Sequence, residues 1–243
     1  VAQYALDEEQ IKPYFELDRV LRDGAFYTAN QLYGLTFRER RDLPVYHPDV
    51  RVFEVFDADS SSIGLLYADY YKRDNKQGGA WMSNFVDGSP LLGTKPVVYN
   101  VCNFTKPAAG QPALLTWDDV GTMFHEFGHA LHGLLNAVPY PRLAGNVPTD
   151  FVEVPSQFME HWALYPSVFA HYARHHQTGA PMPAGLVAKI RRSTTFNQGF
   201  ITTEYVAASL LDLVWHALPA GERQANVDSF EVAALRRYGV DLP

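Results

Sequence analysis

Two histidines four positions apart, with a glutamate directly after the first, are the residues of this chain best suited to chemistry. His125, Glu126 and His129 form an H-E-x-x-H pattern inside an apolar segment that is typical of a helix. On a helix the two imidazoles lie on one face, about 40° apart and roughly 6 Å apart along the axis, so both can reach one metal ion. Zinc suits such a pair, and Glu126 can take a proton from a zinc-bound water. The pattern therefore predicts a zinc metalloprotease.

A catalytic zinc site needs a third protein ligand, because three ligands leave the fourth position for water. His132 does not fit, since it lies about 10 Å along the helix axis from His125, whereas ligand atoms on one zinc are at most about 4 Å apart. The next predicted helix offers Asp150, Glu153, Glu160 and His161. Glu153 and Glu160 share a face, so one can bind the metal while the other holds a ligating histidine. Spacing alone does not decide between them.

The composition is that of a globular chain. Its 243 residues are 47% hydrophobic and 14% aromatic, which is enough for a sizeable core. Lys and Arg number 20 against 27 Asp and Glu, a net charge of −7, and no basic cluster is present, which argues against a nucleic acid or a membrane as partner. The single cysteine, Cys102, cannot form an internal disulfide, and no leader or long apolar run appears. We therefore expect a cytoplasmic protein.

Hydrophobic periodicity predicts a mainly α fold with a small, mainly antiparallel β-sheet. The chain is expected to form one partial catalytic domain over residues 1–243. Its predicted elements are a helix over 7–33, the sheet over 50–101, a zinc helix over 117–136, a ligand helix over 150–173 that is interrupted near Pro166, and further helices over 183–238. Thr116 and Asp119 predict a capping box at the start of the zinc helix.

These residues and several longer strings resemble the thimet oligopeptidase family of zinc peptidases, most closely its bacterial peptidyl-dipeptidase (Dcp) branch. The strings are HEFGHALH at 125–132, FVEVPSQ at 151–157, YADYY at 67–71, GGAWM at 78–82, PVVYNVCNF at 96–104, EHW at 160–162 and RHH at 174–176, so the resemblance covers essentially the whole chain. It implies that His125, His129 and Glu153 bind one Zn²⁺, that Glu126 is the general base, and that Glu160 orients a ligating histidine.

The resemblance also implies a zincin-like catalytic portion of a larger helical peptidase that acts on oligopeptides. Gly79, Ala80 and Trp81 are expected on an edge strand to which an extended substrate adds, although a hairpin turn leading into a core strand is the alternative. The Dcp branch implies release of dipeptides from the C-terminus of the substrate. Internal cleavage of the oligopeptidase A type is the alternative activity.

Family members are longer than this chain, which leads to a further expectation. A helical portion before residue 1 would form the opposite wall of a substrate channel, and a Gly- and Tyr-rich segment after residue 243 would stabilise the oxyanion. Losing one such group costs about a hundredfold to a thousandfold in rate, so we expect impaired hydrolysis and self-association through an uncovered apolar face. A non-catalytic zinc-binding or peptide-binding fragment is the alternative from another class.

Overall fold

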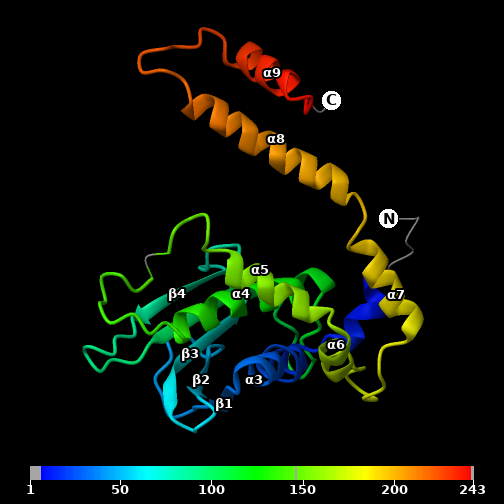
Figure 1. Cartoon of the computed structure of the whole chain (residues 1–243). Coiled ribbons are helices and arrows are strands. Elements are labelled where there is room, and N and C mark those ends of the chain that lie inside the picture. The colour runs from blue at the N-terminus through cyan, green and yellow to red at the C-terminus, as the bar shows by residue number, and fades with distance from the viewer. Residues whose placement is uncertain (1–6, 146, 242–243) are drawn as a thin grey trace. The chain divides into compact units, whose positions relative to one another are not determined.

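The computed structural model describes residues 7–145 and 147–241, and the chain divides into two compact units at residue 188. The candidate site lies in the first unit. The strands of this unit are β1 (Thr36–Glu39), β2 (Arg51–Phe56), β3 (Ser62–Tyr71), β4 (Trp81–Val86) and β5 (Val97–Phe104). Its main helices are α3 (Tyr27–Tyr33), α4 (Trp117–Leu134), α5 (Val154–Ala163) and α6 (Pro166–Tyr172), and α7 (Ala184–Ser193) crosses the boundary between the units (Figure 1).

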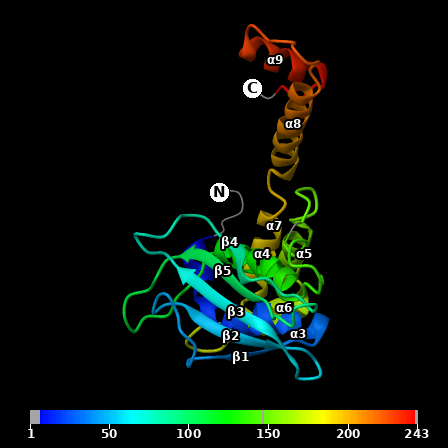
Figure 2. The ribbon, with the colours of Figure 1, turned by 90° about the vertical axis from the view of Figure 1, so that its left-hand side faces the viewer.

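The five strands form one sheet in the order β1-β2-β3-β5-β4, with β4 at an edge (Figure 2). Three of the four strand pairs are antiparallel, and β3 pairs with β5 in parallel. The expected fold, mainly α with a small and mainly antiparallel sheet, is therefore confirmed. Strand β5 is rich in valine and aromatic residues and carries the apolar side chains that pack under α4.

Helix α4 is the central helix of the unit and packs against both β5 and α5. Thr116 and Asp119 form the predicted capping box, in which each side chain accepts a hydrogen bond from the other residue's backbone N–H. The buried face of α4 includes Val120, Phe124 and Leu131, which recur at helical spacing. The helix is thus fixed at its start by the cap and along its length by the core.

Several elements differ from their predicted ranges. The segment expected as one helix over 7–33 consists of α1 (Glu8–Ile11), a 3₁₀ turn (Lys12–Tyr14), α2 (Leu17–Arg19), a π-helical stretch (Val20–Phe26) and α3. Pro13 accounts for the first break, because it lacks an N–H and fixes φ. The ligand helix begins at Val154 rather than at 150, with Pro155 in its first turn, and the expected interruption before Pro166 separates α5 from α6.

The second unit contains α8 (Gln198–His216) and α9 (Val227–Arg237), which pack against each other. The rings of Trp215 and Phe230 lie 4.4 Å apart between their centroids. Most of α8 is exposed, and Ala207 is the buried residue of the helix. No helix in the described part of the chain has the length and apolar character that a membrane span requires.

Candidate metal centre and active site

The structure brings His125, His129 and Glu153 together at the crossing of α4 and the start of α5. These three residues form the His-His-Glu cluster. The carboxylate oxygen Oε2 of Glu153 lies 3.2 Å from Nε2 of His125 and 3.1 Å from Nε2 of His129. One ligand atom from each residue lies within 4.8 Å of the others, and within the described residues this is the group of His, Cys, Asp and Glu side chains that could hold a metal ion. His132 is not part of the group.

Glu160 lies on α5, seven residues after Glu153, and holds His125 in place. Its Oε1 lies 2.5 Å from Nδ1 of His125. An ionised carboxylate only accepts hydrogen bonds, so this contact places the imidazole proton on Nδ1 and leaves the lone pair of Nε2 directed at the cluster. The tautomer that can bind a metal is therefore set by Glu160.

Ser156 fixes the glutamate of the cluster. Its hydroxyl lies 2.7 Å from Oε2 and 2.8 Å from the backbone carbonyl of Glu153. The Ser156 hydrogen bond is the main cause that lowers the pKa of Glu153, and His129 and His125 lower it further. Glu153 is therefore held ionised, as a metal ligand must be.

Glu126 lines the same cleft as the cluster, and little of the residue is exposed. The residue is 5% exposed, and its Oε2 has no hydrogen-bond partner within the described chain. Burial raises the pKa of Glu126 to about 7, with His125 lowering it and Glu153 raising it. The side-chain amide of Asn100, on β5, donates to the backbone carbonyl of Glu126 at 2.7 Å and ties this turn of α4 to the sheet. A buried carboxylate with a free oxygen and a pKa near neutrality suits a general base.

Burial also affects the second histidine. It lowers the pKa of His129, while the Glu153 carboxylate raises it. The net direction is downward, which favours the neutral imidazole that a metal requires.

A cleft of about 650 Å³ lies in front of these residues. Its lining includes Ala80 just before the edge strand β4, Trp81 and Asn84 on that strand, and His129 and Glu153 of the cluster. Of the predicted substrate-binding residues, Ala80 and Trp81 line this cleft, whereas Gly79 is not among its lining residues. The edge of β4 away from β5 pairs with no strand in the described residues.

The donor set and its spacing fit zinc. Two imidazole nitrogens and one carboxylate oxygen are a known ligand set for catalytic zinc, with the fourth position left for water. Atoms that bind one tetrahedral ion at about 2.1 Å lie about 3.4 Å apart, and the two His–Glu153 distances are 3.2 and 3.1 Å. Glu126 lines the same cleft as these three residues, so its carboxylate lies where it could accept a hydrogen bond from a metal-bound water.

Three residues of this site were not expected from the sequence: Asn100, Ser156 and Gly128, the last lying where α4 and α5 cross closely. Asn100 could have been noticed as a polar residue inside an apolar strand run, since a buried amide needs a partner. Ser156 lies three positions after Glu153, a spacing at which a hydroxyl reaches back to the preceding turn. The importance of Gly128 depends on packing between two helices, which no local pattern reveals.

Comparison with known proteins agrees with this arrangement. The profile described as "Peptidase family M3" matches residues 1–241. The chain is 57% identical over 242 residues to the dipeptidyl carboxypeptidase of Escherichia coli (strain K12), covering 99% of this chain and 36% of that protein. It is 40% identical over 222 residues to oligopeptidase A of the same organism, covering 88% and 32%. It is 36% identical over 232 residues to the organellar oligopeptidase A of Arabidopsis thaliana, covering 90% and 29%.

The fold and the His-His-Glu cluster are those of a metallopeptidase, and the profile match identifies its family. This chain belongs to peptidase family M3. It spans about a third of the length of the relatives named above. The resemblance expected from the sequence is therefore confirmed at the level of the family.

Proposed function

We propose that this chain carries the zinc-binding and base residues of a peptidyl-dipeptidase, an enzyme that releases dipeptides from the C-terminus of oligopeptides. The observation that carries the proposal is the convergence of His125, His129 and Glu153 beside the buried carboxylate of Glu126. The 57% identity to a dipeptidyl carboxypeptidase supports the choice of product. The cytoplasmic location expected from the single cysteine stays a prediction.

Each residue has a role that follows from its contacts. Zinc, when bound by His125, His129 and Glu153, would polarise a water molecule and the scissile carbonyl. Glu126 accepts the proton of the attacking water and returns a proton to the leaving amine, because its carboxylate lines the cleft and burial raises its pKa to about 7. Glu160 keeps His125 in the tautomer that binds metal.

The edge of β4 is the proposed binding surface for the substrate backbone. Its free side borders the cleft, and an extended peptide can add to such an edge through main-chain hydrogen bonds. Ala80 and Trp81 would contact the peptide, and Gly79 would contribute its backbone just before the strand. The substrate would then lie between β4 and the His-His-Glu cluster.

Replacing Glu126 by glutamine tests the proposal. The amide cannot accept the proton of the water, so the zinc-loaded Glu126→Gln variant should keep its metal and lose hydrolysis of an N-acetylated oligopeptide. Glu204→Gln, an exposed position on α8, is the matched control and should retain both. Mass spectrometry of the products separates the activities, because dipeptides indicate a peptidyl-dipeptidase and internal fragments an oligopeptidase A type. Near-normal turnover in Glu126→Gln would rule out the base role.

Oligopeptidase A-like internal cleavage is a second candidate, favoured by the 40% identity to oligopeptidase A. A non-catalytic zinc-binding or peptide-binding role is the third. Stoichiometric zinc binding with no hydrolysis of any oligopeptide by the unsubstituted chain would favour that last role and overturn the proposed activity.

A further inference from the structure

The loop that precedes the edge strand β4, residues 72–80, has little packing of its own. A Cβ added at Gly78 or Gly79 would have no atom within 4 Å, so open space surrounds this part of the backbone. Gly79 has φ +91°, a conformation that other residues rarely adopt. A glycine-containing loop without packing is normally mobile, and the strand that follows it would begin at a poorly defined position.

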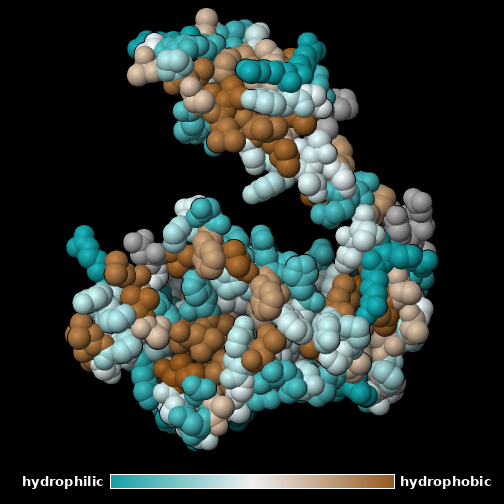
Figure 3. Space-filling view, viewed as in Figure 1, coloured by the Kyte–Doolittle hydropathy of each residue, from teal (hydrophilic) through white to brown (hydrophobic). Residues whose placement is uncertain are grey.

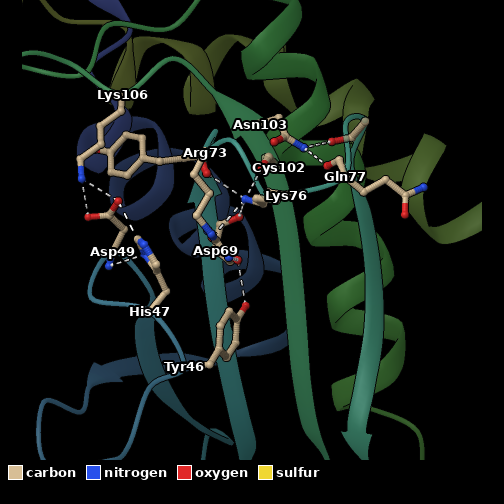
Figure 4. Close-up of polar contacts among 12 residues, drawn as sticks. Tyr46, His47, Asp49, Asp69, Arg73, Lys76, Gln77, Cys102, Asn103 and Lys106 are labelled. Atoms are coloured by element: carbon tan, nitrogen blue, oxygen red, sulfur yellow. Dashed lines mark hydrogen bonds and ion pairs between the residues drawn. The ribbon is translucent and has the colours of Figure 1, made fainter.

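Lys76 attaches this loop to the sheet (Figure 4). Its side chain is 4% exposed, and its ammonium group donates to the backbone carbonyls of Asp69, Tyr71 and Cys102 at 2.8, 3.0 and 2.5 Å. It also contacts the Asp69 carboxylate at 3.0 Å. These acceptors belong to the neighbouring strands β3 and β5, so a single buried side chain connects the loop to both.

Asp69 makes this burial of a lysine tolerable. Its carboxylate, 2% exposed, accepts hydrogen bonds from Arg73 at 2.7 and 2.8 Å and from the hydroxyl of Tyr46 at 2.9 Å, in addition to the contact with Lys76 (Figure 4). A buried charge without such partners is strongly unfavourable. The Asp69 carboxylate therefore balances the charge of the Lys76 ammonium group, and all of the N–H groups of that ammonium have acceptors.

Asn103 holds the other end of the loop. Its side-chain amide nitrogen, on β5, donates to the backbone carbonyl of Gln77 at 2.8 Å and to that of Gly79 at 2.7 Å (Figure 4). The second contact lies two residues before Trp81, where β4 begins. The side-chain amide of Asn103 thus donates both of its N–H groups to backbone carbonyls of the loop.

We propose that Lys76 and Asn103 are positioning residues that hold the loop 72–80 against β3 and β5 and thereby fix the start of the edge strand on which the peptide substrate adds. Neither residue lines the cleft with the His-His-Glu cluster. Their effect should therefore fall on substrate binding and leave the chemical step and the metal site unchanged. The inference rests on the proposed function of β4.

The test compares zinc-loaded Lys76→Met and Asn103→Ala variants with the unsubstituted chain. We expect KM for dipeptide release to rise about tenfold, because the variant must order the loop on binding, while kcat changes by less than about twofold. Zinc content should not change. Hydrogen–deuterium exchange should become faster in residues 77–86 and stay the same in α4.

Two control variants lie on the same loop. Lys72→Met removes an exposed lysine and Asn75→Ala an exposed asparagine, and neither should alter KM or exchange. Asn103→Asp should raise KM more than Asn103→Ala, because a carboxylate would face two carbonyl oxygens. Asn103 is partly exposed, so its variants should fold even if Lys76→Met does not.

Two results would overturn the inference. The first is wild-type KM and wild-type exchange in both Lys76→Met and Asn103→Ala, and the second is a parallel loss of zinc and kcat, which would indicate a general structural role. If the unsubstituted chain does not hydrolyse peptides, the proposed function fails separately. Exchange of residues 77–86, together with the affinity of the zinc-loaded chain for an N-acetylated peptide, then decides the role of Lys76 and Asn103.

Discussion

Gly128 on α4 lies against the backbone of Ser156 on α5 so closely that a Cβ at position 128 would fall 2.7 Å from the Ser156 Cα. The same Cβ would lie 2.5 Å from the Pro155 carbonyl oxygen. Both obstacles are backbone atoms, so they cannot move aside as a flexible side chain could. Because α4 carries the two histidines and Glu153 is the N-cap of α5, this contact sets the distance between the histidines and Glu153.

The first prediction follows from that contact. Gly128→Ala should push α5 away from α4, lower the free energy of unfolding by about 1 to 3 kcal/mol and weaken zinc binding. Gly121→Ala is the matched control on the same helix, because a Cβ there meets no atom within 4 Å. It should stabilise the protein by about 0.5 to 1 kcal/mol, since alanine favours a helix interior over glycine. Urea denaturation with a zinc titration measures both, and equal stability of the two variants would contradict the prediction.

The second prediction ranks the residues around the cluster by zinc affinity. Glu153→Ala should lose the metal, because two ligands hold zinc far less tightly than three. Glu160→Ala should weaken binding by about 10- to 100-fold, as expected for a residue that orients a ligating histidine. His132→Ala should retain wild-type affinity, since His132 is outside the cluster. Competition with a chromophoric chelator gives the order, and loss of zinc in His132→Ala would show that the assignment of ligands is wrong.

The catalytic helix could be predicted from the sequence because its signals are local. The capping box at Thr116 and the spacing of the two histidines depend on residues within a few turns of one another, and local backbone chemistry decides them. The break at Pro13 also has a local cause, the missing N–H of proline, but the prediction of one helix over 7–33 missed it.

Other features depend on tertiary contacts and could not be predicted in this way. Strand β1 (Thr36–Glu39) has only four residues, two of them charged, and it exists because it pairs with β2 at the edge of the sheet. The parallel pairing of β3 with β5 and the contact of Gly128 with Ser156 join residues about 30 positions apart. No periodic pattern in either segment encodes such a contact.

The third prediction concerns pH and the buried Asp69. Burial raises the pKa of this carboxyl, but hydrogen bonds from Arg73, Lys76 and Tyr46 outweigh burial and lower it below its ordinary value. A carboxyl with a depressed folded-state pKa stabilises the fold above its unfolded pKa of about 3.9, and this stabilisation is lost as the pH falls through the folded-state value. Asp69→Asn should therefore cost about 3 kcal/mol at neutral pH, because it leaves buried cations less compensated, and the difference should shrink below about pH 4.

Unfolding in urea at a series of pH values measures this difference. Asp74→Asn removes an exposed carboxylate on the loop that follows β3, and its effect should stay within about 0.5 kcal/mol at every pH. A difference between Asp69→Asn and the unsubstituted chain that does not change between pH 7 and pH 3 would contradict the assignment of the stabilisation to the ionised carboxylate.

The last prediction concerns helix α8, whose apolar side chains have no cover within their own unit. Phe200, Ile201, Tyr205 and Leu213 are 53%, 51%, 75% and 63% exposed, and Figure 3 shows hydrophobic residues gathered on the unit that α8 and α9 form. Glu204 and Asp212 are the only acidic residues of α8, and the helix carries no lysine or arginine, so little charge opposes contact with a second copy. Apolar surface of this extent favours association.

We therefore expect the 243-residue chain to self-associate through α8 at micromolar concentration. Replacing Phe200, Tyr205 and Leu213 together by glutamine should shift the chain to the monomer in analytical ultracentrifugation, because it removes the apolar side chains that a second copy would cover. Thr202→Gln, an exposed polar position on the same helix, should leave the association unchanged. A chain that stays monomeric at this concentration would contradict this prediction, since its apolar helix would then need no partner.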